Sequence, residues 1–387
     1  MKKFIPYGRH KIFKSDFNAV KEVLNSEYLT QGPTVLEFEK KFQLKVKSKY
    51  SIAMNSATSA LHAACVALDI KKNDKVWVSA ITFVASANCA LHCDAKIDFV
   101  DIDLNTFNIS IDALEKKLIK TSKHERPKLL IIVHLGGLPC NMLKIYKLSK
   151  IYNFKVIEDA SHATGSKLNN KFIGNCKYSD LTVFSLHPVK IITSGEGGLI
   201  TTNKKYLNDK LKILREHGIE KNQKKIKEKI DGPWFYQQVE LGYNFRMSDL
   251  HASLGQSQLK KLNHFVYERN KLAKKYHYEL KNLPIKFQVV DSNCNSSYHL
   301  FIIRVDEKIH QDLFRYLRKK KINVNLHYIP VYRHFYYQKI KKYNFKNFKN
   351  SETYYKTAIS LPIFPGLLKK DHLFVINSLK SFFKKIN

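Results

Sequence analysis

Short apolar runs alternate with stretches of helical periodicity through the first two hundred residues of the chain. Segments such as 59–70 and 111–119 place their apolar residues on one face of a helix. Parallel strands need crossovers about as long as a helix, and such crossovers cover both faces of the sheet. We therefore predict an α/β fold with a mostly parallel central sheet and helices on both faces. The strand-length runs occupy residues 51–54, 75–80, 97–102, 129–135, 156–159, 181–186 and 199–202.

The chain of 387 residues is long enough for two domains, each with its own core. We predict a large α/β domain over residues 1–250. A smaller α+β domain is predicted over residues 251–387. A helix is expected over 250–265, and a strand is expected to begin near 297–301.

The formal net charge of +34 allows two interpretations. One is attraction to a polyanion, such as nucleic acid or an anionic membrane. The other is that lysine has replaced other surface residues throughout the chain. We favour the second, because the lysines run from Lys2 to Lys385 without forming a block or a nucleic-acid motif. No nucleic-acid or membrane partner is therefore expected, although a positive field would favour an anionic substrate.

Neither a secretory signal nor a membrane span is expected from the apolar runs. The N-terminal segment has basic residues but no continuous apolar stretch, and the longest apolar run, 129–133, has only the length of a strand. We therefore expect a cytoplasmic protein. Of the six cysteines, Cys89 and Cys93 are four apart with only His92 nearby, which is too few ligands for zinc, so no metal site is expected.

The stretch Leu181–Thr202 contains a lysine in an unusual setting. Lys190 lies between Val189 and Ile191, after a strand-like run, and three glycines follow within eight residues. A lysine partly removed from water has a lowered pKa and can attack an aldehyde. In a chain this rich in lysine, the alternative of a solvated lysine in a surface loop is commoner. Periodicity and composition do not decide between the two.

The amino-acid sequence of this stretch resembles that of a known family. Phe184–Lys190, FSLHPVK, followed by Thr193–Gly198, TSGEGG, is similar to the lysine segment of the pyridoxal-phosphate-dependent nucleotide-sugar aminotransferases, the DegT/DnrJ/EryC1/StrS family. The HPVK form, and GPWFYQQ at 232–238, are closest to the branch that makes the 4-amino sugar precursor of pseudaminic acid. The resemblance implies fold type I of the pyridoxal-phosphate enzymes, like aspartate aminotransferase. It also implies that Lys190 binds the cofactor as a Schiff base and acts as general base, while Ser185 helps to hold its phosphate.

Two earlier motifs extend the resemblance to cofactor binding. NSATSALHAA at 55–64 matches the family's phosphate-binding segment, so Ala57 and Thr58 are predicted to hold the phosphate at a helix start. An ordinary helix cap is the alternative. Phe83 matches the aromatic that stacks on the pyridine ring, although by sequence alone it would more often be a core residue.

A carboxylate and a histidine follow the strand that ends near residue 159. EDASHATGS at 158–166 resembles a family motif in which Asp159 pairs with the pyridine nitrogen and His162 lies near the phenolic oxygen. Ligands of α/β sheets bind at this end of the strands, which agrees with the assignment. A helix cap for Asp159 and a structural role for His162 are the alternatives.

Three further motifs concern the substrate and a second subunit. IPYGR at 5–9 resembles the family's N-terminal arm, which lies over the substrate site and belongs to the large domain. HYIPV at 327–331 matches a late family motif, and Tyr7, His327 and Tyr328 are predicted by this resemblance to contact substrate. For Tyr7 a simple packing role is equally plausible. In LGYNFRMSD, Asn244 matches a residue that reaches the cofactor phosphate of the neighbouring subunit, which implies a homodimer.

The resemblance implies a transamination. Glutamate gives its amino group to pyridoxal phosphate, and the acceptor is a UDP-linked 4-keto-6-deoxy-N-acetylhexosamine. Another UDP- or dTDP-linked keto-sugar is the first alternative. A deoxysugar dehydratase of the same family would have histidine in place of Lys190. A non-catalytic basic binding protein on the same scaffold is the remaining alternative.

Overall fold

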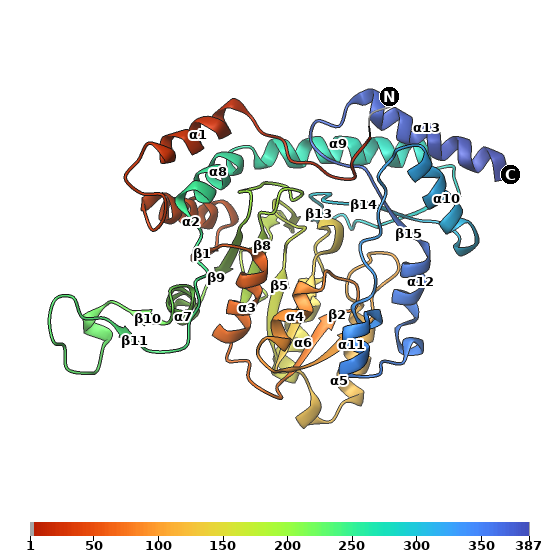
Figure 1. Cartoon of the computed structure of the whole chain (residues 1–387). Coiled ribbons are helices and arrows are strands. Elements are labelled where there is room, and N and C mark those ends of the chain that lie inside the picture. Colours follow the sequence, from red (N-terminus) through yellow and green to blue (C-terminus); the bar gives the residue numbers. More distant parts are fainter. Residues whose placement is uncertain (1–3, 387) are drawn as a thin grey trace.

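The computed structural model describes residues 4–386 and centres on a seven-stranded sheet (Figure 1). One strand runs antiparallel to both of its neighbours, and the other pairings are parallel, which confirms the predicted mostly parallel sheet. From one edge to the other the strands are β1 (Tyr50–Met54), β9 (Gly198–Thr202, the antiparallel strand), β8 (Leu181–Ser185), β5 (Lys155–Asp159), β4 (Leu129–Val133), β2 (Lys75–Ser79) and β3 (Lys96–Val100).

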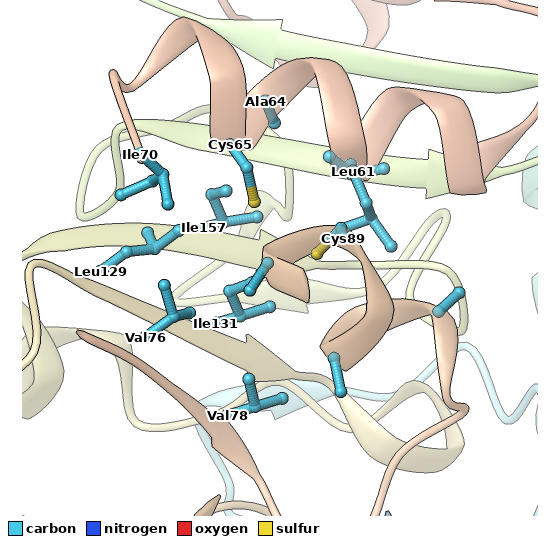
Figure 2. Packing of buried hydrophobic residues seen from close by; sticks show 14 of the residues in the cluster. Leu61, Ala64, Cys65, Ile70, Val76, Val78, Cys89, Leu129, Ile131 and Ile157 are labelled. Carbon is cyan, nitrogen blue, oxygen red and sulfur yellow. The ribbon is translucent and has the colours of Figure 1, made fainter. Parts of the chain in front are cut away.

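Helices cover both faces of this sheet, as predicted. Side chains alternate along each strand, so Leu129 and Ile131 of β4 face one helical layer while Leu130 and Ile132 face the other. Figure 2 shows Leu129 and Ile131 packed below the helix that begins at Ala57. Each such buried aliphatic side chain contributes about 1.5–3 kcal/mol. The first layer holds α3 (Ala57–Ala67), α4 (Ala85–Leu91) and α7 (Lys205–Arg215), and the second holds α5 (Ile111–Lys120) and α6 (Met142–Tyr152).

Four helices lie along one side of the large sheet: α1 (Lys14–Leu24), α2 (Pro33–Val46), α8 (Asp249–Leu259) and α9 (Leu262–Leu280) (Figure 1). The single helix expected over 250–265 is wrong, because α8 and α9 are separated at Lys260 and Lys261. The break is stabilised by tertiary contacts, since Lys261 Nζ donates to Asp16 Oδ1 of α1 at 2.8 Å and Gln258 Nε2 donates to Asp16 Oδ2 at 2.8 Å.

A second core forms around a three-stranded antiparallel sheet. It includes Ile5 from the N-terminal segment, which pairs with Ile322. The segment 331–348 returns to the first core, where Tyr332 and Tyr337 are buried. The division at residue 250 stays a prediction. The second core contains β12 (Lys286–Phe287), β14 (Phe301–Arg304), β15 (Ala358–Leu361), α10 (Glu307–Lys319) and α13 (Lys369–Ile386). The other helices of the C-terminal part are α11 (Phe335–Ile340), within the segment that returns to the first core, and α12 (Lys349–Thr357).

A hairpin-like arm, residues 216–240, projects away from the body of the molecule (Figure 1). Its strands β10 (Ile219–Glu220) and β11 (Gln237–Gln238) are short, and Trp234 within it is 75% exposed. A small sheet of β6 (Lys167–Leu168), β7 (Lys171–Phe172) and β13 (Cys294–Asn295) lies elsewhere. Within residues 4–386, no helix combines the length and apolarity needed to cross a membrane.

Candidate active site

A cavity of about 410 Å³ opens at the carboxyl edge of the large sheet, where β4, β5 and β8 end. This is the edge at which parallel α/β sheets bind ligands. The cavity brings together residues that lie more than three hundred positions apart in the chain. Those predicted from the sequence that line it are Tyr7, Ala57, Thr58, Phe83, Asp159, His162, Ser185, Lys190, His327 and Tyr328.

Lys190 lies on the lysine loop, residues 186–197, which joins the neighbouring strands β8 and β9. The loop is closed by two backbone hydrogen bonds, from Leu186 N to Gly197 O at 2.9 Å and from Ser194 N to Leu186 O at 3.0 Å. Burial lowers the pKa of the Lys190 amine to about 8, and the attraction of Asp159 opposes that shift. At pH 7 about one amine in ten is then uncharged, against roughly one in three thousand at an ordinary lysine pKa. The amine is therefore suited to act as a nucleophile and a base.

Asp159 ends β5 with its carboxylate held from two sides. Ser86 Oγ donates to Oδ2 at 2.6 Å and Ser161 N donates to Oδ1 at 3.0 Å. Thr82 and Ser86 share a further hydrogen bond of 2.7 Å. The carboxylate is thus fixed in direction at the cavity wall. Ser86 and Thr82 were not identified from the sequence, because a serine on a short helix and a threonine in the turn before it have no distinguishing pattern.

The N-terminus of α3 forms the end of the cavity next to Ser185. Ser56 caps the helix by accepting from Ser59 N at 3.1 Å, while the N–H groups of Ala57 and Thr58 have no acceptor inside the helix. Free N–H groups and the helix dipole favour a phosphate here. Gly198 lets β9 approach this turn, since a Cβ at that position would lie 2.4 Å from Ser56 O.

Aromatic and imidazole rings line another part of the cavity wall. The Phe83 ring, 56% exposed, lies 5.9 Å from the Tyr328 ring, and Tyr7 lies 5.0 Å from His327. Burial lowers the pKa of His327 to about 3, so this imidazole is neutral at physiological pH. His162 Nε2 lies 2.9 Å from Tyr328 Oη. The wall therefore offers apolar faces and neutral hydrogen-bonding groups.

Asn244 does not line the cavity of its own chain. It lies at the base of the arm, where it pairs with Glu216, and its carbonyl accepts from Asn55 Nδ2 at 3.2 Å. Its side chain is exposed. A role toward a neighbouring subunit stays a prediction. Glu196 and Asn325 do line the cavity, although neither was identified from the sequence.

The cavity fits pyridoxal phosphate by the chemistry of its donors. A lysine with a lowered pKa can attack an aldehyde, free N–H groups can bind a phosphate, and a fixed carboxylate can pair with a ring nitrogen. The flat face of Phe83 suits an aromatic ring. Across the described part of the chain, no group of three or more histidine, cysteine or carboxylate side chains could hold a metal ion.

Comparison with known proteins agrees with this reading of the cavity. Residues 10–380 match the DegT/DnrJ/EryC1/StrS aminotransferase family. The chain is 37% identical to the UDP-4-amino-4,6-dideoxy-N-acetyl-beta-L-altrosamine transaminase of Campylobacter jejuni, over 99% of this chain and 98% of that protein.

Solved structures give the same result. Helicobacter pylori PseC, an aminotransferase involved in the biosynthesis of pseudaminic acid, superposes with a TM-score of 0.88 at 30% identity, covering 99% of this chain and 100% of that one. The PLP-form of the putative sugar aminotransferase Spr1654 from Streptococcus pneumoniae superposes with a TM-score of 0.89 at 26% identity, covering 100% of both chains. The chain therefore belongs to the DegT/DnrJ/EryC1/StrS family of pyridoxal-phosphate-dependent sugar aminotransferases.

Proposed function

We propose that this enzyme transfers the amino group of L-glutamate to C4 of a UDP-linked 4-keto-6-deoxy-N-acetylhexosamine. The specific acceptor is UDP-2-acetamido-2,6-dideoxy-β-L-arabino-hexos-4-ulose, and the product is a 4-amino sugar for pseudaminic acid biosynthesis. The main observation that supports amino transfer is that Lys190, with its lowered pKa, and Asp159 line the same cavity. The choice of sugar is supported by the names of the Campylobacter and Helicobacter relatives and by the HPVK and GPWFYQQ motifs.

Five of the cavity residues have defined tasks in this proposal. When bound, pyridoxal phosphate supplies an electron sink that stabilises negative charge on the carbon that loses its proton. Lys190 Nζ takes that proton and returns it, which its pKa of about 8 permits near neutral pH. Asp159 keeps a proton on the ring nitrogen. Ser185 and the N–H groups of Ala57 and Thr58 bind the phosphate.

Amino-transfer assays with L-glutamate and a panel of UDP- and dTDP-linked keto-sugars test the substrate. We expect the highest kcat/KM with the UDP-β-L-arabino-hexos-4-ulose. Preference for another UDP-sugar, or for a dTDP-sugar, would replace the proposed acceptor and leave the aminotransferase assignment intact.

We further propose that the active site is completed by a second copy of the chain. Asn244 is exposed at the base of the arm and does not line its own cavity, so it is free to donate to the cofactor phosphate of a neighbour. Mixing Lys190→Ala and Asn244→Asp chains tests this arrangement. If each site takes the two residues from different chains, a mixed dimer has one intact site and activity returns. Confirmed subunit exchange without activity would assign Asn244 to its own subunit.

We also propose that the enzyme works in the cytoplasm and has no nucleic-acid or membrane partner. Its lysines are spread along the whole sequence rather than gathered in one segment. Any DNA binding should therefore be unselective and decrease steeply with added salt. Sequence-selective binding that persists at physiological salt would support the alternative of a basic binding protein.

A further inference from the structure

The hydrogen bonds of His162 fix which ring nitrogen carries its proton. Gly136 N donates to Nδ1 at 3.3 Å, and Tyr328 Oη lies 2.9 Å from Nε2. A backbone N–H can only donate, so Nδ1 must present its lone pair. The neutral ring then carries hydrogen on Nε2. A doubly protonated ring would direct an Nδ1–H toward the Gly136 N–H, which the geometry disfavours.

The direction of the next hydrogen bond follows from this tautomer. His162 Nε2–H donates, so Tyr328 Oη accepts. Burial raises the pKa of the Tyr328 hydroxyl well above its ordinary value, so the phenol keeps its own proton. Among the described residues, His162 is the one hydrogen-bond partner of this hydroxyl. Because Tyr328 lines the cavity, its O–H is left to donate to a bound molecule.

The His162 ring is held on several sides. Gly136 has φ +70, and a Cβ there would lie 3.0 Å from Gln288 Oε1, so the turn that supplies the N–H requires glycine. The His299 ring lies 4.3 Å from the His162 ring. Arg269 Nη1, buried in α9, donates to the carbonyl of His299 at 3.1 Å. The imidazole is therefore held by the Gly136 N–H and by the His299 ring, and Arg269 in turn fixes the main chain of His299.

The surroundings of His162 also oppose a second proton. Burial is the largest cause that lowers the pKa of His162 well below its usual value, and the charge of Lys190 and the neighbouring His327 add to it. The ring therefore stays neutral across physiological pH. The titratable or charged groups around it are Asp159, Lys190, Arg269, His299, His327 and Tyr328.

We propose that Tyr328 is a one-way hydrogen-bond donor to an anionic oxygen bound in the cavity, and that His162 is the positioning residue that sets its direction. Two bound oxygens have the required chemistry, namely the phenolic oxygen of the cofactor and a carboxylate oxygen of the amino donor. The inference rests on the aminotransferase reaction but not on the identity of the sugar.

The first test is nuclear magnetic resonance of the full-length holoenzyme labelled with ¹⁵N-histidine. His162→Gln assigns the His162 signal by its disappearance. We expect the neutral tautomer with hydrogen on Nε2 from pH 6 to 8. Hydrogen on Nδ1, or a charged ring in this range, would overturn the proposal without touching the choice of sugar.

The second test measures the donor itself through the variants Tyr328→Phe, His162→Leu and His162→Gln. If the cofactor oxygen accepts from Tyr328, losing the donor leaves that oxygen more basic, so the pH at which the bound cofactor's absorbance titrates should rise by about one unit. If the carboxylate of the amino donor accepts, the KM for L-glutamate should rise about tenfold instead.

His162→Gln and a double variant distinguish the hydrogen bond of His162 from the space that its side chain fills. The glutamine amide can reproduce the Nε2–H donor, so His162→Gln should keep the titration pH and the KM for L-glutamate near their wild-type values, whereas His162→Leu should not. Adding His162→Leu to Tyr328→Phe should have little further effect. Tyr276→Phe, which removes a buried hydroxyl that donates to Pro362 O outside the cavity, is the matched control. If neither the titration nor the KM changes in a folded Tyr328→Phe enzyme, the proposal is wrong.

Discussion

The floor of the cavity and the arm at residues 216–240 are built in opposite ways. In the floor, Asp159 and Ser185 end buried strands, and Lys190 lies on a loop closed by backbone hydrogen bonds. In the arm, Trp234 is 75% exposed and β10 pairs with β11 over two residues each. The floor is complete within one chain, whereas the arm has few contacts with its own body.

This difference separates two kinds of predicted site residue. The floor residues depend on internal packing, so a substitution there should alter cofactor chemistry and often stability. A substitution of Asn244, at the base of the arm, should alter cofactor binding without altering the fold of its own chain. Five substitutions or titrations test this contrast.

Lys190→Ala should have the largest effect. Without the amine, no residue can bind the cofactor aldehyde covalently at this position or move the proton, so amino transfer should fall by about 10³-fold or more. Mass spectrometry after borohydride reduction should find no cofactor attached to the variant. Lys205→Ala, which changes an exposed lysine on α7, should retain both the label and the activity. A label of normal yield on Lys190→Ala would contradict the assignment.

Gly198→Ala should have the next largest effect. Its Cβ would lie 2.4 Å from Ser56 O, so either β9 or the start of α3 must move. Such overpacking costs about 1–3 kcal/mol. Chemical denaturation should show this loss, and the holoenzyme should release its cofactor faster. Gly8→Ala is the control, because the nearest atom to its added Cβ is Val189 Cβ at 3.9 Å. Equal cofactor release from the two variants would show that α3 is not the phosphate site.

Ser86→Ala removes the 2.6 Å donor to Asp159 and should lower kcat about tenfold, because the carboxylate loses its orientation. The bound cofactor's absorption spectrum should shift with it. Ser79→Ala is the matched control, because Ser79 is a buried serine whose Oγ has no hydrogen-bond partner among the described residues. An unchanged kcat in Ser86→Ala would mean that Asp159 is oriented by Ser161 N alone.

The pH dependence of cofactor capture should report the Lys190 pKa. The uncharged amine attacks the aldehyde, so the rate at which the apoenzyme binds pyridoxal phosphate covalently should rise with pH up to about 8 and then level off. Asp159→Asn removes the attraction that opposes the lowering, so its plateau should begin at a lower pH. Stopped-flow absorbance follows the reaction. A plateau near the ordinary lysine value would show that the amine is solvated.

Asn244→Ala should have the smallest effect on stability. The exposed side chain makes no hydrogen bond within the described part of its own chain, so the free energy of unfolding should change by less than about 0.5 kcal/mol. Cofactor release should nevertheless become faster if Asn244 donates to a neighbour's phosphate. A large loss of stability in thermal denaturation, with no change in cofactor release, would place Asn244 with the internally packed residues.

The strands of the large sheet were predictable because their signal is local. Leu129–Val133 is apolar throughout, as a strand buried on both faces must be. The predicted end at residue 135 was two residues too late, since Leu135 enters a tight turn with Gly136 and Gly137. The break between α8 and α9 could not be predicted, because no glycine or proline marks it in the sequence and it depends on contacts with Asp16.

The cavity residues were predicted chiefly through the family resemblance. Their types alone left common alternatives open, as for Phe83, which the structure places at the cavity with 56% exposure rather than in the core. Ser86 and Gly136 could not be found this way. Their roles arise from single contacts, with Asp159 and His162, between segments that are distant in sequence.

The closure of the lysine loop has a consequence for how the chain can change in length. Residues 186–197 connect two hydrogen-bonded neighbours, so both ends of the loop are fixed by the sheet. An extra residue between His187 and Gly197 would have to displace the amine or break the closing bonds. Extra residues near Trp234, which is 75% exposed, would displace no packed side chain of their own chain. Insertion scanning should therefore find the first segment intolerant and the second permissive, whatever residue types are inserted.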